Sequence, residues 1–137
     1  RRTIYFPSWA RWRPRSCMQG WGRRFVVVAP DGTALPCHAA KILGLELDNV
    51  ASRSLDSIWF ESASFEAFRG DAWMQEPCRS CERKSIDFAG CRCQAQLLAG
   101  DASATDPACD RSPNHAPVRG LVSAPRQLVQ LRTRQLA

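Results

Sequence analysis

The chain has 137 residues, of which 45% are hydrophobic and 23% are charged, a composition typical of one globular domain. No apolar run approaches the roughly 18 residues that a membrane-spanning helix needs, and no secretory signal pattern is found, so we expect a cytoplasmic protein. The net charge of +6 would by itself favour an acidic partner such as nucleic acid, but the cysteine content offers another explanation.

The first third of the chain predicts an extended segment followed by a β-hairpin. Residues 1–16 are rich in Arg and Trp and contain two Pro, so we expect a lead-in or linker. Residues 25–29 are apolar and are followed by Pro-Asp-Gly-Thr, which supplies the turn residues of a hairpin. The second arm of this hairpin would be residues 34–37 and would end at Cys37.

A helical pattern begins at Ser54, a residue type that suits an N-cap. Leu55, Ile58 and Trp59 share one face of the expected helix, which we expect to continue past Ser62 to Phe68. Gly70 would end it. These apolar side chains are interpreted as core residues.

The second half of the chain predicts loops around metal. Residues 77–93 have no sustained period and contain most of the cysteines, which favours a loop wrapped on metal over disorder. Residues 91–98 have helical composition and stop at Gly100. The basic tail, 116–137, predicts either a short amphipathic helix over 125–136 or a frayed end. The expected fold class is a small, loop-rich α+β domain stapled by metal, with one hairpin and short helices.

Seven cysteines and one aspartate supply eight metal ligands, enough for two four-coordinate centres. They form the pattern Cys-x14-Gly-x4-Cys, then Cys-x2-Cys-x9-Cys-x-Cys, then a distant Cys, and their positions are Cys17, Cys37, Cys78, Cys81, Asp87, Cys91, Cys93 and Cys109. An odd number of cysteines argues against a scheme of disulfides alone. Two zinc ions remain an alternative to iron-sulfur clusters, with His38 as a further zinc ligand.

The spacing of Cys91 and Cys93 decides how the ligands are divided. In an extended segment the two side chains point the same way, whereas at the start of a helix they diverge by about 200°. Because Cys91 opens the expected helix, we favour division between two centres. Cys78, Cys81 and Cys91 then share one centre with Asp87 as the fourth ligand. Cys93 joins the other centre, with Cys17, Cys37 and Cys109.

Basic residues lie among these ligands along the chain. Arg79, Arg83, Lys84 and Arg92 are placed where a cation lowers the cost of assembling thiolates. The sequence therefore favours charge compensation as the source of much of the positive charge.

The order of these residues resembles the seven-cysteine SPASM domain at the C-terminal end of peptide-modifying radical S-adenosylmethionine (SAM) enzymes, and within them the PqqE-like enzymes of pyrroloquinoline quinone (PQQ) biosynthesis. The resemblance covers about residues 16–115. It rests on the segments Cys17-Met-Gln-Gly-Trp-Gly-Arg23, Leu35-Pro-Cys-His-Ala-Ala40, Phe68-Arg-Gly70, Glu76-Pro-Cys-Arg-Ser-Cys81, Gly90-Cys-Arg-Cys-Gln-Ala95 and Thr105-Asp-Pro-Ala-Cys109.

The resemblance implies two auxiliary iron-sulfur clusters, both 4Fe-4S or one of them 2Fe-2S, bound by residues 17–115 and divided as above. It also implies an oxidoreductase that joins a glutamate to a tyrosine of a PqqA-like precursor peptide, presented by a PqqD-like chaperone. The Cys-x3-Cys-x2-Cys motif of the SAM-binding cluster is not found in the sequence, and a radical SAM barrel needs more than 137 residues. We therefore expect no catalytic residue here and no activity without a radical SAM domain in cis, which would bind SAM and a third cluster.

Two hypotheses follow from the sequence. The first is an auxiliary-cluster domain that transfers electrons and shapes the peptide site, where Trp21, Arg23 and Arg24 are candidate peptide contacts. The alternative is a zinc-stapled basic module that binds a peptide or, less in keeping with the compensated charge, nucleic acid.

Overall fold

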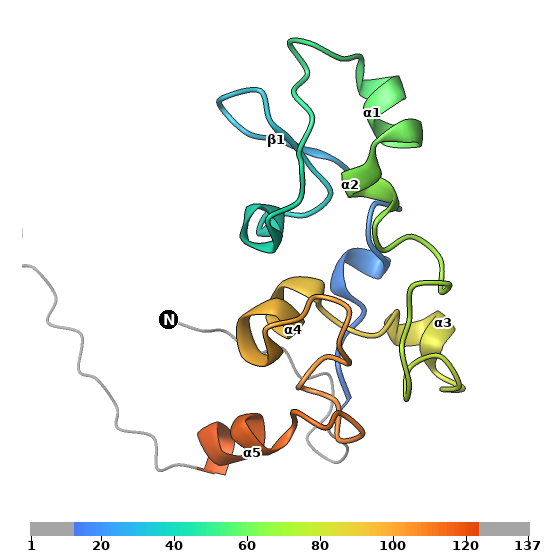
Figure 1. Ribbon diagram of the computed structural model, residues 1–137, viewed down its shortest axis with the longest axis vertical. Helices are drawn as coiled ribbons and strands as arrows, with labels where there is room; N and C mark the ends of the chain where they lie inside the picture. Colours follow the sequence, from blue (N-terminus) through green and yellow to red (C-terminus); the bar gives the residue numbers. More distant parts are fainter. Residues whose placement is uncertain (1–12, 124–137) are drawn as a thin grey trace, which may run out of the picture.

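A computed structural model describes residues 13–123 of the chain, with side chains described to residue 120. In chain order the elements are the 3-10 helix η1 (Cys17–Gln19), β1 (Val27–Val28), β2 (Ala34–Leu35), the 3-10 helix η2 (Ala40–Leu43), α1 (Leu55–Glu61), α2 (Ala63–Glu66), α3 (Lys84–Asp87), α4 (Arg92–Ala99) and α5 (Ala116–Ser123). Figure 1 shows the hairpin, α1 and α2 toward one end, and α3, α4 and α5 toward the other. The expected small, loop-rich α+β fold is confirmed.

The hairpin forms where the sequence predicts it. Antiparallel β1 and β2 pair Val27 with Leu35 and Val28 with Ala34. Gly32 occupies the left-handed region at the turn, with φ +82°, where a Cβ atom would also lie 2.6 Å from Oδ1 of Asn49. The arms are shorter than expected, because Pro36 cannot donate a ladder hydrogen bond.

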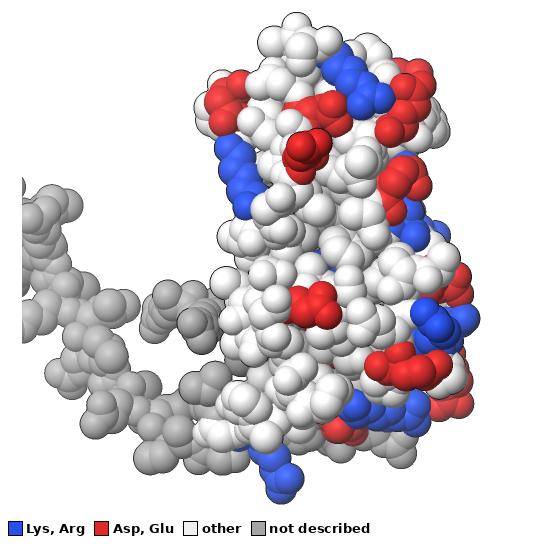
Figure 2. All heavy atoms as spheres, viewed as in Figure 1, with Lys and Arg blue, Asp and Glu red and all other residues white. Residues whose placement is uncertain are grey.

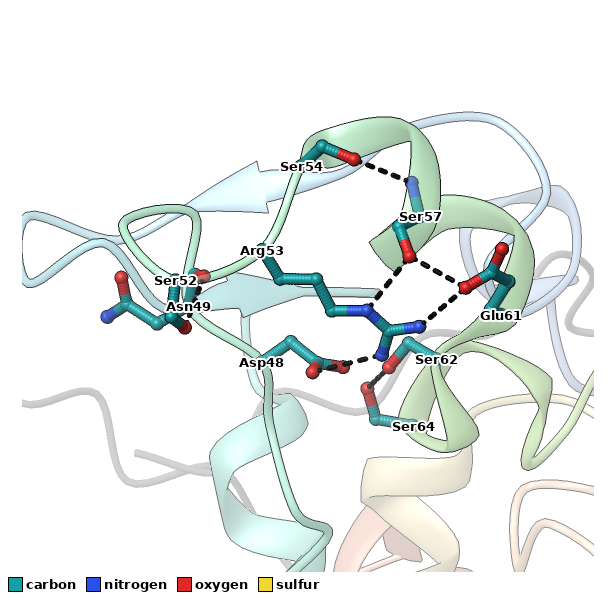
Figure 3. Close-up of polar contacts among 9 residues, drawn as sticks. All are labelled: Asp48, Asn49, Ser52, Arg53, Ser54, Ser57, Glu61, Ser62 and Ser64. Atoms are coloured by element: carbon teal, nitrogen blue, oxygen red, sulfur yellow. Dashed lines mark hydrogen bonds and ion pairs between the residues drawn. The ribbon is translucent and has the colours of Figure 1, made fainter.

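The expected helix from Ser54 to Phe68 is interrupted at Ser62. The cap is confirmed, since the Ser57 N–H donates to Ser54 Oγ at 3.2 Å. Ser62, however, is extended (φ −69°, ψ 128°), and its buried hydroxyl bonds that of Ser64 at 2.9 Å. This local hydrogen bond competes with continuation of the helix. Figure 3 shows the serine pair beside Arg53, which contacts Asp48, Ser57 and Glu61 and ties the preceding loop to α1.

Two apolar clusters form the core. One consists of Ala34, Ile58 and Phe65, all fully buried, and joins the hairpin to α1 and α2. Leu55 was expected in the core, but this is wrong, because it lies 48% exposed in the first turn of α1. The larger cluster consists of Trp21, Leu35, Cys37, Ala40, Phe68 and Cys93. Two of the cysteines therefore lie within the core itself.

The segment around residues 77–93 is mostly turns, but it contains α3. Three consecutive residues with positive φ, Phe88, Ala89 and Gly90, follow α3 and redirect the chain toward Cys91. The expected helix after Cys91 is confirmed as α4, which ends at Gly100 with φ 76°. The expected helix over 125–136 lies outside the described residues. None of the helices in the described part has the length and apolarity needed to span a membrane.

Candidate metal centres

Cys91 is not the first residue of a helix but the extended residue before it, with φ −92° and ψ 116°. Cys93 is the second residue of α4, so the pair spans the boundary of the helix and lacks the divergence of two helical residues. The sulfur of Cys91 accordingly contacts that of Cys93, and both face the same group of thiols.

The first centre, here the Cys17 group, contains Cys17, Cys37, Cys91 and Cys93. Cys37 Sγ lies 3.5 Å from Cys93 Sγ, and Cys17 contacts Cys91. The hydrogen bond to Cys91 raises the pKa of the Cys17 thiol, and that to Cys37 raises the pKa of Cys93. The same contacts lower the pKa of the acceptors Cys91 and Cys37. The thiols of this group thus share protons with one another, and either sulfur of the Cys37–Cys93 pair can be the donor.

The second centre, here the Asp87 group, contains Cys78, Cys81, Asp87 and Cys109, which line one pocket. A turn in which the Cys81 N–H donates to the Cys78 carbonyl at 3.1 Å brings the first two together. Asp87 is the last residue of α3 and is only 7% exposed. Burial raises the pKa of the Cys78 and Cys109 thiols and of the Asp87 carboxyl.

This geometry differs from the expected division at two positions. The sequence favoured Cys91 with Cys78 and Cys81, and Cys109 with Cys17. The structure exchanges them, and places Cys91 against Cys17 while Cys109 lines the pocket of Cys78 and Cys81. The physical reason is the extended backbone at Cys91, which removes the divergence that a helical residue would have. The other six residues lie in the groups expected.

The separation of the donor sulfurs excludes disulfides. All seven cysteines are free, and the separation of 3.5 Å between Cys37 and Cys93 is far above the roughly 2.05 Å of a disulfide. Within the described residues, no three candidate ligands lie close enough together to hold a single metal ion. A cavity of about 330 Å³ lies against Cys17 and Cys91 and leaves room for a group larger than one ion.

Asp106, which the sequence did not single out, connects the two centres. Its buried carboxylate accepts the Cys91 N–H at 2.7 Å and the Ala108 N–H at 2.9 Å, and its main-chain carbonyl accepts the Cys109 N–H at 2.8 Å. The close approach depends on Gly90, where a Cβ atom would lie 2.4 Å from Asp106 Oδ2. The one signal in the sequence for this role is the position of Asp106, three residues before the candidate ligand Cys109.

The four expected compensating cations have different partners. Arg83 faces Asp87, with 3.6 Å between Nε and Oδ2. Arg92 is 3% exposed and donates to the carbonyls of residues 89, 102 and 104, and its Nε has no hydrogen-bond partner within the described residues. A buried N–H without an acceptor suits a site that receives a group rich in sulfur acceptors. Arg79 instead donates to the Met74 carbonyl, and Lys84 pairs with Asp71.

Other side chains singled out in the sequence lie away from the two groups or in the core. His38 is exposed, and its ring centroid lies 6.0 Å from that of Phe25, so no contact supports it as a zinc ligand. Trp21, a suggested peptide contact, is only 7% exposed and donates to the Ser64 carbonyl. It is a core residue. Figure 2 shows acidic and basic side chains interspersed on the face that it draws.

Comparison with known proteins agrees with this donor set. Residues 17–82 match the family model of the SPASM iron-sulfur cluster-binding domain. The chain therefore contains a SPASM domain. The PqqA peptide cyclase of Methylobacterium sp. (strain 4-46) is 53% identical to it over 122 residues, which are 88% of this chain and 32% of the relative. The chain is thus a homologue of a PqqA peptide cyclase, and it spans about a third of the length of that relative.

Proposed function

We propose that this chain is the auxiliary-cluster domain of a PqqE-like radical SAM enzyme, with one cluster held by the Cys17 group and a second held by the Asp87 group. The observation that supports it is the arrangement of the eight candidate ligands in two sets of four. The resident groups are two 4Fe-4S clusters, or one 4Fe-4S and one 2Fe-2S. The family match favours iron-sulfur clusters over the zinc alternative.

The bound clusters would accept and pass on single electrons during turnover. The residues of this chain keep the ligands in place, with Cys37, Cys93 and Cys109 buried and the other four cysteines half-buried. Cys37 and Cys93 hold one group within the apolar core, and α3 and the turn at Cys78 hold the other. Loading requires thiolates, so the protons on the cysteine thiols leave when metal binds.

In the proposed enzyme the radical is generated by a SAM-binding domain in cis, and the substrate is a PqqA-like peptide presented by a PqqD-like chaperone. The reaction is a carbon-carbon bond between a glutamate and a tyrosine of that peptide. The name of the relative supports the peptide substrate. Since thiolate ligands need a reducing compartment, we propose the cytoplasm as the location. This chain without the SAM-binding domain should have no cyclase activity.

The first test is the iron and sulfide content of the 137-residue chain, reconstituted without oxygen. About eight irons and eight sulfides would support two 4Fe-4S centres, and about six of each would support one 4Fe-4S with one 2Fe-2S. Variants Cys37→Ala and Cys81→Ala should each remove one centre and leave the other. About two zinc ions and no sulfide would overturn the proposal in favour of a zinc-stapled module.

A further inference from the structure

The two centres differ in the side chains around their sulfurs. In the Asp87 group, Arg111 Nη1 donates to Cys81 Sγ at 3.6 Å, and Arg13 Nη1 donates to Cys109 Sγ at 3.8 Å. Arg83 faces the Asp87 carboxylate from the opposite end of α3. Three of the four candidate ligands therefore each have an arginine of their own.

Within the described residues, no arginine donates to a sulfur of the Cys17 group, although Arg15 lines the cavity against Cys17 and Cys91. The contacts of its sulfurs are with one another and with backbone N–H groups, such as those of Ala39 and Ala40 beside Cys37. Arg92 is the cation close to both groups, since it interacts electrostatically with Cys17 and Cys91 as well as with Cys78. Because Arg92 is shared, it does not distinguish the centres, whereas Arg13 and Arg111 do.

Arg13 has a second partner beside the pocket, and Arg111 belongs to the pocket wall. Arg13 Nη1 also lies 3.1 Å from Oδ1 of Asp110, the residue after Cys109. This ion pair holds the guanidinium of Arg13 next to Cys109. Arg111 lines the pocket of the Asp87 group. Both arginines therefore come from segments that flank the ligands, in the lead-in before Cys17 and immediately after Cys109.

Hydrogen bonds to ligand sulfurs and nearby positive charge favour the reduced, more negative form of an iron-sulfur cluster. We propose that Arg13 and Arg111 tune the Asp87 group by raising the reduction potential of the cluster bound there. This rests on the proposed function, because it requires a cluster at that group. The three thiolates and the carboxylate of this ligand set are all negatively charged, and the arginines offset part of that charge. The Asp87 centre then accepts an electron more readily than these ligands alone would allow.

The test is a potentiometric titration of the reconstituted 137-residue chain, followed by electron paramagnetic resonance. The signals of the two centres are assigned with Cys37→Ala and Cys81→Ala. Arg111→Gln and Arg13→Gln each remove one N–H···S contact and one charge. Arg111→Lys keeps the charge. Arg53→Gln is the matched control, since Arg53 pairs with Asp48 and Glu61 near α1 and touches neither group.

We expect Arg111→Gln and Arg13→Gln to shift the potential of the Asp87 centre to lower values, with the Cys17 centre unchanged. Arg111→Lys should recover part of the shift, and Arg53→Gln should move neither centre. An unchanged potential in both glutamine variants, or an equal shift of both centres, would overturn the inference while iron content still supports the clusters. If the parent chain binds no cluster at the Asp87 group, the proposed function fails first and the inference with it.

Discussion

Asp106 accepts the backbone N–H of Cys91 on its carboxylate, with 2.7 Å between Oδ2 and N. The same carboxylate accepts from Gln94 and from the Ala108 N–H, and the carbonyl of the residue holds Cys109. One buried aspartate thus positions the backbone of one cysteine from each group.

Replacement of Asp106 should therefore loosen both centres together. Asp106→Ala leaves one buried and two partly buried donors without their acceptor, at a cost of about 1–3 kcal/mol for the buried group and less for the other two. Asp106→Asn keeps the shape and loses part of the acceptor capacity, so its effect should be smaller. The measurement is the rate of iron release from each centre, followed by paramagnetic resonance. Loss confined to one centre would contradict the connecting role.

A substitution at Gly90 tests the close packing of Asp106 against the backbone of residue 90. Gly90→Ala places a Cβ atom 2.4 Å from Asp106 Oδ2 and 2.7 Å from Pro14 Cβ, in addition to the strain of a left-handed residue. Gly44→Ala is the control, since it has a similar positive φ but no atom within 4 Å of the added Cβ. The control should cost about 1–2 kcal/mol in the free energy of unfolding. Gly90→Ala should cost clearly more in a urea titration, and equal costs would argue against close packing.

Cys91 and Cys109 decide between the division favoured by the sequence and the grouping in which these side chains lie in the structure. Cys91→Ala should empty the centre that Cys37→Ala also empties, and Cys109→Ala should empty the centre lost in Cys81→Ala. Metal content and paramagnetic resonance of the four variants form the comparison. If Cys91→Ala instead emptied the centre lost in Cys81→Ala, and Cys109→Ala the centre lost in Cys37→Ala, the division that the sequence favoured would be correct.

The buried carboxyl of Asp87 predicts a specific pH dependence of the metal-free chain. Burial raises the pKa of Asp87 above the ordinary value of about 4. A raised pKa in the folded state stabilises the fold at low pH, and this contribution is lost as pH rises through the folded-state pKa. The stability of Asp87→Asn relative to the parent should therefore increase as pH rises above about 4, in urea titrations.

Asp71 supplies a control of opposite sign. Its hydrogen bond from Lys84 lowers the pKa of this exposed carboxyl, so it contributes stability at higher pH, which is lost on acidification. Asp71→Asn should therefore lose stability relative to the parent as pH rises. If the stability of both variants relative to the parent changed in the same direction with pH, the assignment of Asp87 to a buried site would be contradicted. In the loaded chain, Asp87→Asn should still release iron from its own centre faster.

The core makes a simpler prediction. Phe65 is fully buried, whereas Leu55 is 48% exposed. Phe65→Ala should cost about 3–5 kcal/mol in the free energy of unfolding. Leu55→Ala should stay within about 0.5 kcal/mol of the parent, as surface substitutions usually do. A large loss at Leu55 in a urea titration would mean that another surface covers it.

Local signals in the sequence were sufficient for the hairpin turn at Gly32, the cap at Ser54 and the stop at Gly100, because each depends on one residue and its neighbours. The helix break at Ser62 depends on a hydroxyl pair that has no strong signature in the sequence. The division of the ligands depends on the backbone angles of Cys91, which spacing leaves open. Arg13 and Asp106 act on cysteines 96 and 15 residues away in the chain, and only the folded structure reveals such contacts.

The aromatic residues of the larger core give the domain a built-in optical reporter. Trp21 and Trp73 flank Phe68 edge to face, with ring centroids 5.3 Å and 5.0 Å from it, in the cluster that contains Cys37 and Cys93. Iron-sulfur chromophores absorb where tryptophan emits. Arrival of a cluster at the Cys17 group should therefore quench the intrinsic fluorescence of the chain, and its loss should restore the emission without any added label.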